Sequence, residues 1–372
     1  MTRILFLFGT RPEAIKLCPL FLHLRKSPDE FNVRACVTAQ HRAMLDQVLE
    51  TFEVVPDYDL NLMLPGQTLF QSTSRILAAM EPVFHDFRPD LAIIQGDTTT
   101  TLAGALGAFY ARVAVGHVEA GLRTFDLAQP FPEEMNRVVA TRLATLHFAA
   151  TAKAADNLLR EGVAADAISI TGNTGIDAVL HVKAKLESGE LRGRDWPELD
   201  PAKKLIVVTA HRRESFGPGF ERICSALKTL SERNDVQIVY PVHPNPNVLD
   251  SVNRILGNSP NILLPEPLDY VSFVDLMRRA YLIVTDSGGV QEEGPSLGKP
   301  ILVLREKTER PEAVEAGTVR LVGSDPKTIL TQANLLLDSP REYASMSRVH
   351  NPYGDGRASE LILGVIRSYF SR

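Results

Sequence analysis

Three acidic residues, Asp97, Glu119 and Glu133, each stand just beyond a short apolar run or at the start of a predicted helix. Carboxylates that meet at one site perturb one another's proton affinity, which suits them to acid/base work. Ordinary structural roles compete with this interpretation. Asp97 would also cap a helix that begins with the threonine run 98–101, and Glu133 would also form an exposed ion pair with Arg137, four residues later, worth about 0.5 kcal/mol. The convergence of three carboxylates favours catalysis.

Two cationic side chains stand near the start of the first predicted helix. Segment 9–13, Gly-Thr-Arg-Pro-Glu, follows the first apolar run, and Lys16 lies about one turn further on. Thr10 would cap this helix, whose free N–H groups together with Arg11 and Lys16 would attract a phosphate. Two solvated surface cations explain the pattern equally well. The segment is not GxGxxG, which disfavours a bound nicotinamide.

A second glycine-rich turn follows the apolar run 282–285. Segment 286–293, Asp-Ser-Gly-Gly-Val-Gln-Glu-Glu, would let backbone approach a ligand closely and would present a helix start to a pyrophosphate. A carboxylate here would accept hydrogen bonds from sugar hydroxyls. The segment lacks the Lys-Ser/Thr of a Walker loop, and a plain strand-to-helix turn is the alternative.

Two histidines also follow apolar runs. His211 precedes two arginines, so a phosphate or leaving-group contact is plausible there. His243 is expected to be packed or hydrogen-bonded rather than catalytic. A metal site is the weaker idea, because His117 and Glu119 match only half of a zinc-deaminase pattern and no CxxC follows.

The elements that must position these residues follow from apolar runs that alternate with amphipathic stretches, a pattern typical of βαβ units. The predicted strands are 4–8, 33–38, 91–95, 113–117, 146–149 and 168–171, then 205–209, 237–242, 262–264, 282–285, 301–304 and 319–322. They predict an α/β protein with two doubly wound Rossmann-like lobes, 1–175 and 176–352, that face a central cleft. A C-terminal helix within 353–372 is expected to cross back to the first lobe.

Composition excludes several classes of protein. The 372 residues are 44% apolar and 23% charged, which is ordinary for a globular chain, and the net charge of -5 argues against a nucleic-acid-coating surface. No apolar run is long enough to span a membrane. Three widely spaced cysteines indicate buried free thiols in a reducing compartment, so we expect a cytoplasmic protein.

Taken together, these motifs resemble the bacterial non-hydrolysing UDP-N-acetylglucosamine 2-epimerases. The resemblance covers nearly the whole length through segments 8–14, 38–42, 96–101, 116–123, 171–174, 211–214, 286–293, 308–312 and 351–356. It implies a two-lobed fold like that of B-type glycosyltransferases, and reversible conversion of UDP-N-acetylglucosamine (UDP-GlcNAc) into UDP-N-acetylmannosamine (UDP-ManNAc). It also implies a homodimer without metal or redox cofactor, which supplies activated ManNAc for cell-surface polysaccharide.

The resemblance carries roles to particular positions. The implied acid/base residues are Asp97, Glu119 and Glu133, with His211 close to the diphosphate. The implied UDP contacts are Arg11, Lys16, the backbone of Phe273, Ser287, Gly288, Gly289, Glu293 and Arg310, and Arg137 is a further substrate contact. Several bacterial members bind a second UDP-GlcNAc as activator, and the matching positions here include Gln40, Gln67 and His243. Gln95, Gln129 and Gly294 depart from residues frequent in the family, but none belongs to these sets.

Inverting C2 of the sugar needs a proton to leave one face and return to the other. Without a nicotinamide to oxidise C3, the workable route expels UDP from C1 as a carboxylate removes the C2 proton, which gives a 2-acetamidoglucal. Three alternatives stay open: a glycosyltransferase of similar fold that uses a UDP-sugar donor, a hydrolysing epimerase, and a nucleotide-sugar sensor without turnover. A sensor would leave three clustered carboxylates without a task.

Overall fold

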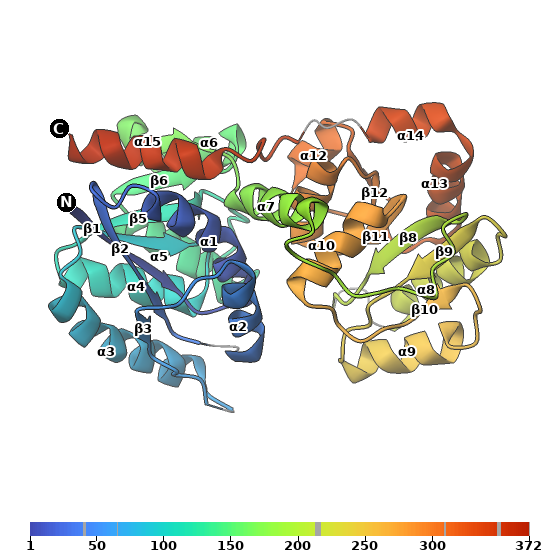
Figure 1. The fold of residues 1–372 in the computed structure, drawn as a ribbon, viewed down its shortest axis with the longest axis horizontal. Helices are drawn as coiled ribbons and strands as arrows, with labels where there is room; N and C mark the ends of the chain where they lie inside the picture. The colour runs from blue at the N-terminus through green and yellow to red at the C-terminus, as the bar shows by residue number, and fades with distance from the viewer. Residues whose placement is uncertain (40–41, 65, 213–216, 309, 348–350, 372) are drawn as a thin grey trace. The chain divides into compact units, whose positions relative to one another are not determined.

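The computed structural model describes residues 1–39, 42–64, 66–212, 217–308, 310–347 and 351–371. The chain divides into two compact units, one of Met1–Ala178 with Tyr353–Arg372 and one of Val179–Pro352 (Figure 1). The division falls inside helix α7 (Thr174–Ser188), whereas the sequence analysis set it between residues 175 and 176. Helix α7 also runs into the charged stretch after residue 183, where the sequence shows little apolar periodicity.

The first unit is built on one parallel sheet of seven strands in the order β3-β2-β1-β4-β5-β6-β7. Its strands are β1 (Thr2–Phe8), β2 (Phe31–Val37), β3 (Tyr58–Asp59), β4 (Leu91–Gln95), β5 (Ala114–Ala120), β6 (Leu146–Ala149) and β7 (Ile168–Ile170). The prediction of a doubly wound parallel sheet is confirmed. The two-residue edge strand β3 was not predicted, because so short a strand has no apolar alternation.

Helices cover both faces of this sheet. They are α1 (Arg11–Arg25), α2 (Arg42–Thr51), α3 (Leu69–Phe87), α4 (Thr99–Tyr110), α5 (Glu133–Leu143), α6 (Ala152–Arg160) and α15 (Ala358–Phe370), with the short η1 (Ala165–Ala167). Leu5 and Leu7 of β1 belong to a buried cluster with apolar residues of α3 and α4. Phe6, between them, points the other way and meets Phe21 of α1 edge-on, with 5.4 Å between ring centroids.

The second unit repeats the plan with six parallel strands in the order β10-β9-β8-β11-β12-β13. The strands are β8 (Lys204–Thr209), β9 (Val236–Val239), β10 (Ile262–Leu263), β11 (Leu282–Thr285), β12 (Ile301–Val303) and β13 (Val319–Leu321). The helices are α8 (Pro218–Ser231), α9 (Pro246–Leu256), α10 (Tyr270–Arg279), α11 (Gly288–Glu293), η3 (Gly294–Leu297), α12 (Pro311–Glu315), α13 (Pro326–Asp338) and α14 (Pro340–Met346). Apolar residues of α8, α9 and α13 share one buried core with this sheet.

The C-terminal helix α15 belongs to the first unit, where it packs against α1 (Figure 1). The carboxylate of Asp177, on α7, accepts hydrogen bonds from the N–H groups of Ala358 (3.2 Å) and Ser359 (2.8 Å) at the start of α15. Burial raises the pKa of Asp177, and these hydrogen bonds act against that shift. No helix in the described residues is long and apolar enough to cross a membrane.

We expect Asp177→Ala to loosen α15, because two N–H groups at the helix start lose their acceptor. The free energy of unfolding should fall by about 1–2 kcal/mol, and amide hydrogen exchange in α15 should speed up. Asp355→Ala is the matched control, since the hydrogen bond that Asp355 accepts from Arg357 N–H is exposed. Equal effects of the two substitutions would contradict this account of how α15 is held.

Candidate active site

A buried carboxylate joins two loops at the carboxyl edge of the first sheet. The chain leaves β1 for β2 on one side, and β4 lies on the other, so the loops after β1 and β4 meet at a topological switch point. Glu13 Oε2 accepts from Gly9 N–H (3.0 Å) and Thr10 N–H (2.8 Å), and Glu13 Oε1 accepts from the Thr98 hydroxyl (2.6 Å). Burial raises the pKa of Glu13, and the hydrogen bonds from Thr98, Thr10 and Gly9 oppose that shift.

The same loops are packed too closely for larger residues. A Cβ on Gly9 would lie 2.0 Å from Thr38 Oγ1, which is itself hydrogen-bonded to Thr100 Oγ1 at 2.9 Å. Thr10 caps α1 as predicted, and Glu13 completes a capping box with it. The start of α1, which carries Arg11 as its first residue, is therefore held rigidly against the turn after β4.

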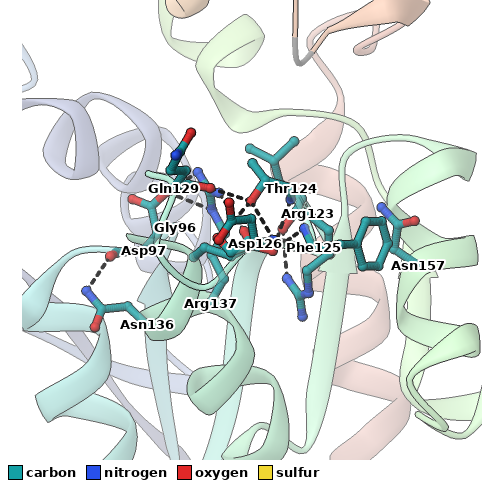
Figure 2. Close-up of polar contacts among 12 residues, drawn as sticks. Gly96, Asp97, Arg123, Thr124, Phe125, Asp126, Gln129, Asn136, Arg137 and Asn157 are labelled. Atoms are coloured by element: carbon teal, nitrogen blue, oxygen red, sulfur yellow. Dashed lines mark hydrogen bonds and ion pairs between the residues drawn. The ribbon is translucent and has the colours of Figure 1, made fainter. Parts of the chain in front are cut away.

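Asp97 lies in that turn, and its carboxylate does not cap the following helix. The cap of α4 is Thr98, whose hydroxyl accepts from Thr101 N–H. Asp97 Oδ2 instead accepts from the Arg137 guanidinium, at 2.9 Å from Nε and 2.6 Å from the nearer terminal nitrogen (Figure 2). The Asn136 side chain donates to the Asp97 carbonyl at 2.7 Å. Two residues of helix α5 therefore donate hydrogen bonds to Asp97, one to its backbone carbonyl and one to its carboxylate.

Glu119 occupies a strained position at the end of β5. Its φ of 63° is unusual for a residue with a side chain, and the register of β5 with β6 shifts at this point. Such backbone strain is common at functional sites. The Glu119 carboxylate pairs with Lys16 of α1, and both side chains are largely buried. Lys16, predicted as a phosphate contact, therefore lies against a predicted acid/base residue.

Glu133 is the first residue of α5 and is partly exposed. The exposed ion pair of Glu133 with Arg137, which was the structural alternative to a catalytic Glu133, is not among the ion pairs of the described residues. Arg137 is buried and pairs with Asp97 and with Glu134, whose Oε2 lies 2.9 Å from the guanidinium. Burial would lower the pKa of Arg137, but the two carboxylates outweigh it and raise that pKa. Glu134 was missed because the sequence shows a charge there, not its burial.

A buried histidine, His117, contacts the turn that carries Asp97, and a second, His147, lies beside it. His117 and His147 are paired neighbours on β5 and β6, and His117 Nε2 lies 2.8 Å from the Gly96 carbonyl. Burial lowers the pKa of each imidazole to about 4. Both rings are therefore neutral near pH 7, and we assign His117 the tautomer that donates from Nε2 to Gly96.

The second unit has a comparable junction at its own switch point, between β8 and β11. Asp286 is buried, and its Oδ2 accepts from the N–H groups of His211 and Arg212, both at 2.7 Å. His211 Nδ1 lies 3.4 Å from Asp286 Oδ1. The His211 ring stacks on His243, with centroids 5.3 Å apart, and His243 Nδ1 accepts from Asn245 N–H. The exposed His243 side chain thus has one ring contact and one hydrogen bond, and its role stays a prediction.

The glycine-rich turn after β11 lies under an arginine. A Cβ on Gly288 would lie 2.6 Å from the guanidinium carbon of Arg310, so only glycine lets Arg310 lie over the start of α11. Arg310 Nε donates to Glu292 Oε1 at 2.6 Å, and both side chains are largely buried. Two predicted UDP contacts, Gly288 and Arg310, are therefore in direct contact.

The remaining predicted residues are more scattered. Ser287 and Gly289 flank Gly288, and Glu293 ends α11. Phe273 lies in α10, where its N–H donates to the Asp269 carbonyl, and Gln67 bonds backbone groups of its own loop. Gln40 lies outside the described residues. Within the described part of the chain, no group of three or more His, Cys, Asp or Glu side chains is arranged to hold a metal ion.

We expect Glu13→Gln to change how stability depends on pH. Folding raises the pKa of Glu13 above 4.5, so the folded protein favours the protonated, neutral side chain. The free energy of unfolding of wild type should therefore fall as the pH rises from 4.5 through the raised pKa. Glutamine does not titrate, so the variant should not show this loss. The free energy of unfolding of the variant minus that of wild type should therefore increase with pH over this range. Urea unfolding between pH 4 and 9 measures the difference. Glu50→Gln, on exposed α2 surface, should show no such trend; a flat difference for Glu13→Gln would contradict the argument.

Comparison with known proteins places these features in a family. A sequence model of the UDP-N-acetylglucosamine 2-epimerase family matches residues 23–367. The chain is 56% identical over 372 residues to the UDP-N-acetylglucosamine 2-epimerase of Salmonella typhimurium, with 99% of each protein covered. It is 56% identical over 371 residues to the enzyme of that name from Escherichia coli K12, with 98% of each covered.

Solved structures show the same likeness. The UDP-GlcNAc 2-epimerase from Neisseria meningitidis bound to UDP-GlcNAc has a TM-score of 0.91 and 45% identity, and the match covers 99% of this chain and 100% of that one. The S. aureus MnaA-UDP co-structure has a TM-score of 0.90 and 45% identity, covering 100% and 97%. Matched in sequence and fold over nearly its whole length, the chain belongs to the UDP-N-acetylglucosamine 2-epimerase family.

Proposed function

We propose that this chain catalyses the reversible epimerisation of UDP-GlcNAc at C2 to give UDP-ManNAc, without hydrolysis. The observation that carries the proposal is the set of three carboxylates on adjoining elements of the first unit. Asp97 follows β4, and Glu119 lies at the end of the neighbouring strand β5; each is paired with a cation. Glu133 begins helix α5, which contacts Asp97 through Asn136 and Arg137. Carboxylates near a reacting carbon suit proton removal and return.

The proposed reaction has two halves. In the first, a carboxylate takes the proton from C2, the C–H electron pair forms a C1–C2 double bond, and the C1–O bond breaks, so UDP leaves with that electron pair. The intermediate is 2-acetamidoglucal. In the second half, a proton is added to the opposite face of C2 while an oxygen of UDP bonds again to C1. Atoms and electrons balance without a redox cofactor.

Charge that grows on the departing diphosphate needs preorganised cations, which typically supply a few kcal/mol per donor. We propose Arg11 and Lys16 of the first unit and Arg310 of the second for this role, with His211 near the diphosphate. The position of Arg310 against Gly288, at the start of α11, supports its assignment. Keeping water from C1 would separate epimerisation from hydrolysis.

Two other outcomes are distinguished by one measurement. Proton NMR of UDP-GlcNAc with the purified protein would show UDP-ManNAc for the proposed reaction. Free N-acetylmannosamine and UDP would indicate a hydrolysing epimerase. Donor that stays unchanged until an acceptor is added would indicate a glycosyltransferase.

We expect Asp97→Asn, Glu119→Gln and Glu133→Gln each to lower turnover by about 10²–10⁴-fold, because each removes one proton-transfer group. UDP affinity, measured by calorimetry, should stay close to that of wild type, since the substitutions keep side-chain size. Unchanged turnover in all three variants would refute the assignment of these carboxylates.

Proton exchange gives an independent expectation. In D2O, deuterium should enter C2 of the product, because the proton removed by a carboxylate exchanges with solvent before C2 is protonated again. NMR or mass spectrometry detects the label. Product that keeps its original C2 hydrogen would exclude this route, whatever its rate.

Two finer features are proposed from the family resemblance alone. We propose a homodimer in solution, and a regulatory site at which a second UDP-GlcNAc is bound with help from Gln67 and His243. To contact such a ligand, the Gln67 and His243 side chains would have to break the hydrogen bonds that they form within their own loops.

A further inference from the structure

Glu134 is a fully buried carboxylate outside the predicted site set, and it contacts both Arg137 and the backbone of Thr124 and Phe125. None of its side chain is exposed. Its Oε1 accepts from the N–H groups of Thr124 and Phe125, both at 3.0 Å, and its Oε2 lies 2.9 Å from Arg137. Three donors therefore converge on one carboxylate, which compensates its burial.

The contact with Arg137 fixes the geometry of Asp97. A guanidinium is planar and rigid, so a carboxylate bonded to one of its terminal nitrogens also fixes the orientation of the other nitrogens. Those other nitrogens, Nε and the second terminal nitrogen, point at Asp97 Oδ2 (Figure 2). With only 8% of its side chain exposed, Arg137 has little room to turn. Glu134 thus orients Asp97 through Arg137.

The contact with the backbone fixes the segment between Glu119 and Glu133. Phe125 has a φ of 63°, and the Thr124 hydroxyl donates to the Gln129 carbonyl at 2.5 Å, so the segment closes on itself (Figure 2). The two N–H groups held by Glu134 attach this closed segment to α5. Glu133, one residue before Glu134, begins the same helix.

We propose that Glu134 is a positioning residue of the active site: its buried carboxylate holds Arg137 against Asp97 and fastens segment 124–129 to the helix that begins at Glu133. The inference rests on the proposed epimerase function. Glu134 touches no reacting atom. Its role is to keep the acid/base groups aligned, because a displacement of about 1 Å in a reacting group costs on the order of 100-fold in rate.

The chain offers a matched control in the same unit. Arg123 and Glu161 form a second largely buried pair, with Nε donating at 2.7 Å and a terminal nitrogen at 3.0 Å. Arg123 also donates to the Thr141 hydroxyl of α5 at 2.7 Å, but among the described contacts this pair bonds neither Asp97 nor Glu133. Glu134→Gln and Glu161→Gln therefore both break a carboxylate–guanidinium pair, and only the first touches the carboxylate cluster.

The test measures kcat, KM, UDP affinity and the urea midpoint for wild type, Glu134→Gln and Glu161→Gln in the full chain. In Glu134→Gln the amide oxygen still accepts from Thr124 and Phe125, but its NH2 group faces Arg137 donor to donor. We expect kcat to fall about 100-fold, with KM and UDP affinity within about threefold of wild type. Glu161→Gln should keep kcat within about twofold of wild type, even if its urea midpoint falls as much as that of Glu134→Gln.

A kcat of Glu134→Gln within about threefold of that of Glu161→Gln would overturn the inference, as would parallel losses of kcat and UDP affinity. If Glu134→Gln does not fold, Glu134→Asp provides the test. Its shorter side chain should lower kcat while UDP affinity stays unchanged, and a kcat equal to that of wild type would overturn the proposal. The activity of wild type distinguishes failure of the proposed epimerase function from failure of the inference about Glu134. If wild type makes no UDP-ManNAc, the proposed function fails, whereas an active wild type with an equally active Glu134 variant refutes only this inference.

Discussion

Parallel strands that diverge at a switch point leave loop N–H groups without a ladder partner, and in both units a buried carboxylate accepts them. Glu13 accepts the N–H groups of Gly9 and Thr10 after β1, and it also accepts from the Thr98 hydroxyl after β4. Asp286, which follows β11, accepts the N–H groups of His211 and Arg212 after β8. An unpaired buried N–H costs about 1–3 kcal/mol, so each carboxylate serves the fold first. It also fixes the loops from which the proposed ligand contacts project.

The carboxylate cluster of the first unit depends on the same principle of compensation. A half-buried carboxylate loses hydration, and a nearby cation makes up for part of that loss. Lys16 does this for Glu119, and Arg137 divides its charge between Asp97 and Glu134. The cations are therefore part of how the acids are held. Loss of one partner would leave the other buried without compensation, which is why Glu134 matters beyond its own contacts.

The sequence predicted the strands because apolar runs in a parallel sheet are buried on both faces and stand out. It missed β3, whose two residues, Tyr58 and Asp59, form a short edge strand, and the extent of α7. It found Asp97, Glu119 and Glu133 because each follows a strand or begins a helix. Glu13 and Glu134 were not singled out, since their donors lie as far as 85 and 10 residues away and only folding brings them together. The partners of Arg137 could not be identified for the same reason: helical spacing is visible in sequence, and burial is not.

A formal charge count in the first unit bears on how a diphosphate could be held. Around the cluster, Arg11, Lys16 and Arg137 contribute three positive charges, and Asp97, Glu119, Glu133 and Glu134 contribute four negative ones. Lys16 and Arg137 already pair with carboxylates. In the proposed reaction, Lys16 and Arg137 would therefore offer a departing diphosphate only part of their charge. The second unit carries Arg310 over the start of α11, where the helix terminus adds partial positive charge. In the proposed reaction, proton transfer calls for carboxylates and leaving-group stabilisation calls for cations; the first unit carries the proposed carboxylates, and Arg310 belongs to the second.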